Sequence, residues 1–208
     1  MTDDYPGPPA HERVTPLIIT LSAGDVLYRF NPAGKKSGLF FGKTGDYRWD
    51  APNHSYGVLY ASRDVDTAFA ETYGHGVTKH SLDTNKVISH DSLKKRDIYE
   101  FTVQQELQLA MFYGEGLSVL SLDANICTMP DYSVPQQWSG WVHNLRNKPD
   151  GIIYLPRHLT TGASVALFER AAAGLAEKSL GVADKYRDPD TGRTIDDILE
   201  SQGWALHE

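Results

Sequence analysis

The sequence has little of what marks membrane, secreted or disulfide-stabilised proteins. Its 208 residues contain one cysteine, Cys127, which excludes an internal disulfide and fits a reducing compartment. No apolar run approaches the roughly 20 residues that a membrane-spanning helix needs. Residues 1–5 are acidic and lead into prolines, which is not the pattern of a signal peptide. We therefore expect a cytoplasmic protein without a membrane span.

Positive charge and metal-ligand patterns are also scarce. Twenty Lys and Arg face 27 Asp and Glu, a formal net charge of −7, which argues against broad contact with nucleic acid or anionic membranes but allows a local basic pocket. The eight histidines are scattered, and His75 and His80 lack companions at ligand spacing, so we expect no metal site. Cys127 is interpreted as a small buried hydrophobe rather than a nucleophile.

Short apolar runs rich in β-branched and aromatic residues predict a strand-rich core. Strands are expected at residues 17–21, 25–30, 56–61, 98–103, 107–112, 117–122 and 151–154. Helices are expected at residues 64–73, about 135–146, about 164–179 and 194–202. A strand-rich core with helices grouped at its sides predicts an α+β fold.

The chain divides into three parts by composition. Residues 1–16 are expected to be a flexible lead-in, because their prolines and charged residues offer nothing to pack. Residues 17–180 form the predicted domain. Residues 181–208 are a polar joint and a last helix, which opens with Thr194 and Asp197 in a capping-box arrangement. This last part is interpreted as a cap on the core, with a partner interface or self-association as the alternatives.

The segment from Gly38 to Thr44 has a superficial likeness to a phosphate-binding P-loop. Three residues rather than four separate its glycines, and the following turn and aromatic residues, with Pro52, do not predict the helix that a P-loop opens. We therefore reject a P-loop here.

Four polar side chains have positions from which they can face a ligand. Arg29 lies in the strand 25–30 on the face of Leu27, Arg48 lies in an aromatic loop, Tyr60 ends an apolar strand, and Glu71 comes late in the helix 64–73. Each has an ordinary explanation when taken alone. These are an exposed arginine, an arginine stacked on a ring, a core tyrosine with its hydroxyl at the rim, and a solvated glutamate.

The order of these residues is more specific than any one of them. It resembles the RES domain, the toxin of RES–Xre toxin–antitoxin pairs, in which Tyr-Arg, Arg-Trp, a Leu-Tyr strand and an Ala-x-x-Glu helix follow one another. The matching positions are Arg29, Arg48, Tyr60 and Glu71. The resemblance continues to about residue 170 through the motifs Asp131-Tyr132, Gln137-Trp138, Trp141-Val142-His143, Asp150-Gly151-Ile152-Ile153-Tyr154, Arg157-His158 and Ala166-Leu167-Phe168-Glu169.

Two positions depart from the family pattern. Asp50 stands where the family has asparagine, and Pro156 stands where it has the serine that follows the tyrosine of the Asp-Gly-Ile-x-Tyr strand. Proline has no hydroxyl. Either the hydroxyl is dispensable, or a nearby residue supplies it, the candidates being Thr160, Thr161 and Ser164.

The resemblance implies an ADP-ribosyltransferase-like fold over residues 17–180, breakdown of NAD⁺ by hydrolysis or phosphorolysis, and a cognate Xre-type antitoxin. The residue types suit this chemistry. A carboxylate, here Glu71, stabilises the positive charge that develops on ribose as nicotinamide leaves. Arg29 and Arg48 suit the pyrophosphate and Tyr60 suits nicotinamide, with Glu71, Arg29 and Tyr60 as the catalytic candidates and no metal required.

Two other functions stay open at this point. The same pocket can transfer ADP-ribose to a protein, and Pro156 suits a catalytically silent module that binds a nucleotide or an antitoxin-like partner. The sequence does not distinguish water from phosphate as the acceptor, or a monomer from a homo-oligomer.

Overall fold

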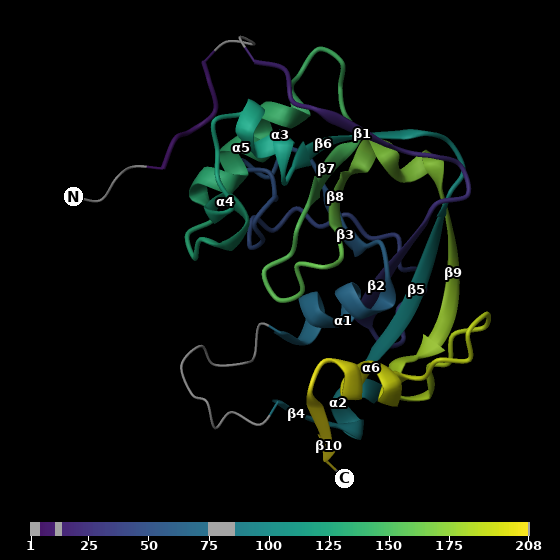
Figure 1. Ribbon diagram of the computed structural model, residues 1–208. Coiled ribbons are helices and arrows are strands. Elements are labelled where there is room, and N and C mark those ends of the chain that lie inside the picture. Colours follow the sequence, from purple (N-terminus) through teal and green to yellow (C-terminus); the bar gives the residue numbers. More distant parts are fainter. Residues whose placement is uncertain (1–4, 11–13, 75–85, 208) are drawn as a thin grey trace.

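A mixed eight-stranded sheet forms the centre of the computed structural model, which describes residues 5–10, 14–74 and 86–207 (Figure 1). The strand order is β1-β6-β7-β8-β3-β2-β5-β9, and neighbours are antiparallel except for β6 and β7. Its strands are β1 (Ile18–Leu21), β2 (Val26–Pro32), β3 (Val58–Ser62), β5 (Arg96–Val103), β6 (Leu107–Phe112), β7 (Gly151–Tyr154), β8 (Ser164–Phe168) and β9 (Leu175–Val182).

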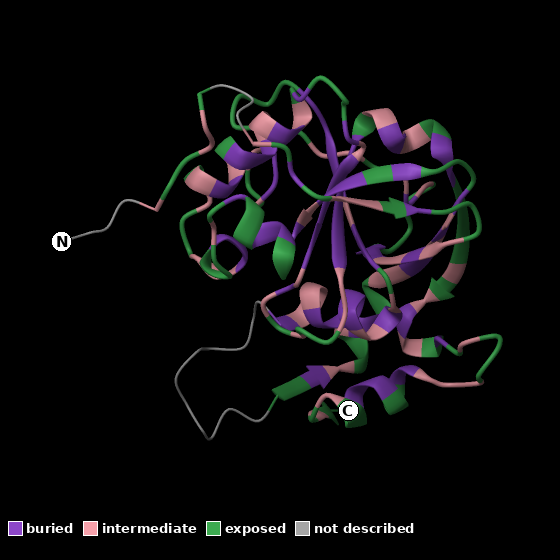
Figure 2. Ribbon diagram, turned by 45° about the horizontal axis from the view of Figure 1, so that its top comes forward, coloured by how far each residue is buried: buried purple, intermediate pink, exposed green. Residues whose placement is uncertain are grey.

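Helices cover this sheet in two groups (Figure 1). The first group is α3 (Glu115–Val119), α4 (Asn125–Thr128) and α5 (Ser133–His143). It closes an aromatic core around Trp49, Phe112 and Trp138. On the opposite face of the sheet, Leu27, Phe101 and Leu167 belong to a second cluster. Figure 2 shows that the strands at the middle of the sheet are buried, which agrees with β7 and β8 being buried at every residue.

The second group surrounds helix α1 (Val65–Tyr73), with Phe69 in its core. Asp64 caps the start of α1 by accepting a hydrogen bond from the backbone N–H of Thr67 at 2.7 Å, and the helix ends at Gly74, as expected. The neighbouring elements are α2 (His90–Lys94), the 3-10 helix η3 (Ala183–Lys185), α6 (Ile195–Ser201), and a parallel pair of strands, β4 (Lys86–Ser89) and β10 (Trp204–His207). The α+β fold class is thereby confirmed.

Six of the predicted strands and three of the predicted helices are confirmed, but two predicted elements are wrong. Residues 117–122 form the end of α3 and a turn, not a strand. Gly116 lies so close to the Met111 carbonyl that a Cβ there would come within 2.2 Å of its oxygen, and the chain turns into a helix against β6. Residues 164–179 form β8, the 3-10 helix η2 (Glu169–Gly174) and part of β9, not one helix. Because β8 is buried on both faces, its apolar run lacks the alternation that identifies a strand.

Described residues near both ends of the chain contact the body of the protein. The Tyr5 hydroxyl donates a hydrogen bond to the Asp123 carbonyl at 2.9 Å, and the Trp138 indole donates to the Pro6 carbonyl at 2.9 Å. The expectation that residues 1–16 have nothing to pack against is therefore wrong for these positions. At the other end, β9 runs past the boundary expected at residue 180, and the capping box of Thr194 opens α6 as predicted.

Within the described residues, no helix is long and apolar enough to cross a membrane.

Candidate active site

The eight-stranded sheet opens between β2 and β3. These strands pair at the single position Tyr28–Ser62, although β2 pairs with β5 along its whole length and β3 does so with β8. Beyond that pair, Gly42 forms an antiparallel bridge with Val58 at the edge of β3. A cavity of about 610 Å³ lies in the opening, within the usual range for small-molecule and cofactor sites. The four residues singled out from the sequence all line it: Arg29, Arg48, Tyr60 and Glu71.

Helix α1 places Glu71 at this cavity while Phe69 packs on the opposite side. The Tyr154 hydroxyl donates a hydrogen bond to Glu71 Oε2 at 3.4 Å. Burial raises the pKa of Glu71, and the hydrogen bond from Tyr154 and the charge of Arg48 act in the opposite direction. A half-buried carboxylate with a perturbed pKa in a cavity is a candidate for chemistry rather than a solvated surface group.

Arg48 lies near Glu71. Its Nη1 donates to the Ile126 carbonyl at 3.2 Å, and its guanidinium lies 4.7 Å from the centre of the Tyr132 ring. The neighbouring Cys127 is buried, and burial raises the pKa of its thiol to about 12. A thiol with so high a pKa is not ionised near neutral pH, which agrees with the interpretation of Cys127 as a small hydrophobe.

Tyr60 lines the cavity with its hydroxyl already engaged. The hydroxyl donates to Asp50 Oδ1 at 2.9 Å and accepts from the Trp49 backbone N–H at 2.9 Å. Asp50 Oδ2 also accepts from the Tyr47 backbone N–H at 3.1 Å. Burial raises the pKa of both Tyr60 and Asp50. The aspartate at the family's asparagine position thus offers two acceptor oxygens where an amide offers one, and the Tyr60 ring remains to contact a ligand.

Arg29 is half-buried, not exposed, so the ordinary explanation of a surface arginine is wrong. Its Nη1 donates to the carbonyls of Phe40 at 3.0 Å and Gly38 at 3.4 Å. Burial lowers the pKa of Arg29, and the positive charge of Arg96 acts in the same direction. The guanidinium is therefore held in place by backbone groups and carries no carboxylate partner among the described residues.

Two serine hydroxyls line the cavity, although Pro156 itself has none. Ser62 and Ser164 are both buried, their Oγ atoms are 2.9 Å apart, and both line the cavity. Ser164 was one of three candidates for the missing hydroxyl; Ser62 and Tyr154 were not assigned from the sequence. Tyr154 belongs to a recognised motif, but its contact with Glu71 joins residues 83 apart, which no local pattern indicates.

The cavity lining is basic although the chain is acidic. It contains three acidic side chains, Asp46, Asp50 and Glu71, and six cationic ones, Arg29, Lys35, Lys36, Arg48, Arg96 and Arg157. This excess of positive charge suits an anionic ligand.

No group of three or more potential metal ligands exists among the described side chains. His75 and His80, weighed above as metal ligands, lie outside the described residues.

Comparison with known proteins identifies the family. A model of the RES domain matches residues 26–188. The probable toxin y4kH of Sinorhizobium fredii (strain NBRC 101917 / NGR234) is 34% identical over 98 residues, which are 46% of this chain and 74% of that protein. The fold is similar to a chain in the crystal structure of the M. tuberculosis MbcT-MbcA toxin-antitoxin complex, with a TM-score of 0.55 and 12% identity over 88% of this chain and 91% of that one. The chain belongs to the RES domain family.

Proposed function

We propose that this protein is the toxin of a toxin–antitoxin pair, and that it binds NAD⁺ between β2 and β3 and breaks the nicotinamide–ribose bond. The observation that supports this best is the position of Glu71. It is a half-buried carboxylate with a raised pKa, held by Tyr154, in a cavity whose other charged groups are mostly cationic.

The proposed chemistry is cleavage of the C–N bond between nicotinamide and ribose. Nicotinamide departs with the electrons of the C–N bond, and positive charge develops on the ribose as in glycoside cleavage. In this proposal ionised Glu71 stabilises that charge, and the hydrogen bond from Tyr154 orients the carboxylate. Water or phosphate then adds to the ribose. Because the pKa of Glu71 is raised, turnover is expected to fall as the pH decreases through that pKa and the carboxyl becomes protonated.

The remaining residues bind and orient the substrate in this proposal. Arg29 and Arg48 bind the two negative charges of the pyrophosphate, and the Tyr60 ring contacts nicotinamide. Ser164, paired with Ser62, takes over the hydroxyl that Pro156 lacks. This pair favours an active enzyme over the silent module.

A cognate antitoxin is the expected partner. One solved structure with a similar fold is a chain of a toxin-antitoxin complex, and an open cavity of this size gives an antitoxin a place to block. Mixing with such a partner is expected to stop turnover.

The test is NAD⁺ consumption by the purified protein, with and without phosphate, beside Glu71→Gln. Removing a charge that acts on the transition state is expected to lower turnover about 100-fold or more. Glu106→Gln, an exposed glutamate in the turn between β5 and β6, is the matched control and should keep native turnover. Near-native turnover in Glu71→Gln would overturn the mechanism.

Two further results separate the alternatives. Dependence on phosphate identifies phosphorolysis, and label from NAD⁺ on lysate proteins identifies a transferase. If the native protein does not consume NAD⁺, the catalytically silent module remains as the explanation.

A further inference from the structure

The loop of residues 33–39, which follows β2 along the cavity, is held in one conformation by carboxylates. Glu177 Oε2 on β9 accepts a hydrogen bond from the Gly38 backbone N–H at 2.7 Å. Asp97 Oδ2 on β5 accepts one from the Gly34 backbone N–H at 2.8 Å. Glu177 Oε2 also accepts from the Leu39 backbone N–H and from the Ser37 hydroxyl, so this carboxylate is engaged by the loop and not by its lysines. The loop is therefore pre-organised before any ligand binds.

Two lysines extend from this loop into the lining of the cavity. Lys35 and Lys36 are exposed, and the Tyr99 hydroxyl fixes the backbone of Lys35 by donating to its carbonyl at 2.8 Å. Arg96, at the start of β5, pairs in register with Pro32 at the end of β2 and lines the same part of the cavity. In the part of the chain that the structure describes, none of these three cations has a carboxylate within ion-pair distance.

The positive charges at this site repel one another. Burial is the main cause that lowers the pKa of Arg29, and the positive charge of Arg96 acts in the same direction, which places the two guanidinium groups near each other. Other cations of the chain contact a carboxylate, as Lys178 does with Glu100 and Lys94 with Asp91. A cluster of unpaired cations on a rigid loop in an acidic protein is an arrangement that a bound anion stabilises.

This cluster is separate from the charges around Glu71. The charge of Arg48 acts on the pKa of Glu71, whereas Lys35 and Lys36 lie in the loop after β2 and Arg96 lies at the start of β5. In the proposed function Arg29 and Arg48 bind the pyrophosphate, which leaves the loop cations free for a further anionic group of the same ligand.

We propose that Lys35, Lys36 and Arg96 bind a phosphate monoester on the adenosine ribose of the dinucleotide, so that the cavity prefers NADP⁺ to NAD⁺. This inference rests on the proposed function for the dinucleotide itself. A phosphate monoester carries close to two negative charges near neutral pH and three acceptor oxygens, and these match a cluster of Lys and Arg donors.

The test compares two ligands that have no nicotinamide bond to break. Calorimetry with the native protein is expected to show that 2′-phospho-ADP-ribose binds about tenfold or more tightly than ADP-ribose, since one or two charge-assisted hydrogen bonds are worth that much. The preference should weaken as salt is added. In Lys35→Ala/Lys36→Ala it should fall to about twofold or less, because most of the loop charge is gone. The control Lys94→Ala/Lys178→Ala makes the same charge change away from the cavity and should keep the full preference.

Three outcomes would overturn the inference. Equal affinity for the two ligands does so while leaving the proposed function intact, provided that NAD⁺ is consumed. A preference that persists in Lys35→Ala/Lys36→Ala places the phosphate elsewhere. Loss of the preference in millimolar inorganic phosphate is expected instead, because free phosphate competes for the same cations. If neither ligand binds, the dinucleotide site fails together with this inference.

Discussion

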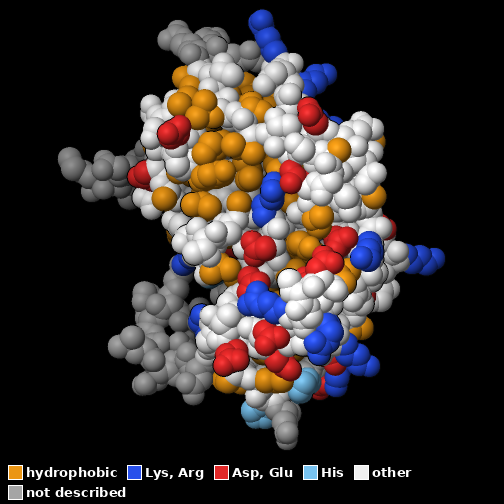
Figure 3. Space-filling model, turned by 45° about the vertical axis from the view of Figure 1, so that its right-hand side comes forward, with side chains coloured by type: hydrophobic (Ala, Val, Ile, Leu, Met, Phe, Trp, Pro, Cys, Tyr) orange, Lys and Arg blue, Asp and Glu red, His pale blue; other side chains and the backbone are white. Residues whose placement is uncertain are grey.

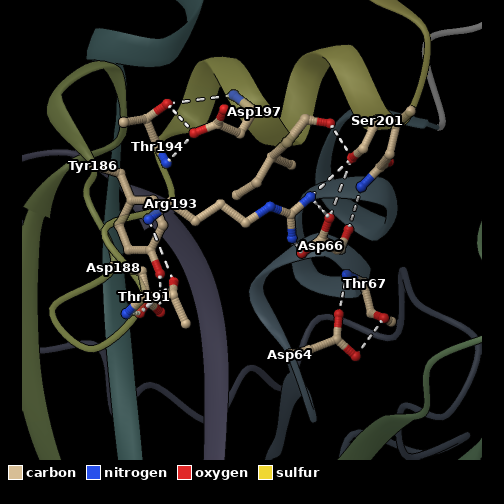
Figure 4. Close-up of polar contacts among 12 residues, drawn as sticks. Asp64, Asp66, Thr67, Tyr186, Asp188, Thr191, Arg193, Thr194, Asp197 and Ser201 are labelled. Carbon is tan, nitrogen blue, oxygen red and sulfur yellow. Dashed lines mark hydrogen bonds and ion pairs between the residues drawn. The ribbon is translucent and has the colours of Figure 1, made fainter.

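Helix α1 separates two regions that differ in how their charged side chains are paired. On the side of the C-terminal segment, Asp66 accepts two hydrogen bonds from the Arg193 guanidinium, one of them at 2.8 Å, and Gln202 donates to the Asp66 carbonyl at 2.9 Å (Figure 4). On the side of the cavity, Glu71 has one long hydrogen bond from Tyr154. Acidic and basic side chains are also interspersed over the lower half of the face in Figure 3.

The paired charges stabilise the fold, whereas the charges at the cavity remain available to bind a ligand. Paired charges around Asp66 fix the N-terminal turn of α1 against α6. Beneath them Phe69 packs against Trp204 and Tyr73, with ring centres 5.6 and 4.8 Å apart. Unpaired or half-buried charges at the cavity cost stability but remain free to bind a ligand. The C-terminal segment thus supports, from one side, the helix that presents Glu71 on the other.

Phe69→Ala tests the apolar layer and is expected to have the largest effect on stability. Truncating a fully buried aromatic ring typically costs about 3–5 kcal/mol in the free energy of unfolding. Urea unfolding measures the loss. Phe40→Ala, whose side chain is 63% exposed, should cost no more than about 0.5 kcal/mol. Similar losses in the two variants would contradict the assignment of the core around α1.

Arg193→Met tests the paired charges. It removes a two-bond contact and leaves Asp66 without a cation, so a loss of about 1–2 kcal/mol is expected. Arg63→Met, which breaks a single contact with Asp25 at 3.2 Å, should cost about 0–1 kcal/mol. A double-mutant cycle with Asp66→Asn isolates the coupling. A coupling energy of zero would show that the pair does not hold α1.

Glu71→Gln tests the cavity side and has the smallest expected effect, with the opposite sign. The pKa of Glu71 is raised in the folded protein, so above the ordinary carboxyl pKa of about 4.3 the unfolded chain ionises more readily than the folded one. Ionised Glu71 therefore lowers the free energy of unfolding, and the neutral amide of glutamine does not. The variant should be more stable at pH 7 by a fraction of a kcal/mol, and this gain should vanish below pH 4. A loss of stability at pH 7 would mean that Glu71 is structural.

Much of the fold could be predicted because strand and helix signals are local. The N-cap at Asp64 and the capping box at Thr194 lie within a few residues of the groups they cap, and both are observed. The prediction failed at residues 164–179, where a strand buried on both faces lacks the alternation that distinguishes a strand from a helix. Which face of β8 meets which cluster depends on neighbours from elsewhere in the chain.

For the site, the sequence by itself determined the residue types and their order. These were enough to identify one candidate set, Arg29, Arg48, Tyr60 and Glu71. Only the tertiary structure decided what surrounds them. The pairing of Ser62 with Ser164, the contact of Tyr154 with Glu71 and the opening between β2 and β3 each join segments that are distant along the chain. Local propensity acts over a few residues, whereas burial and hydrogen bonding act between any groups that the fold brings together.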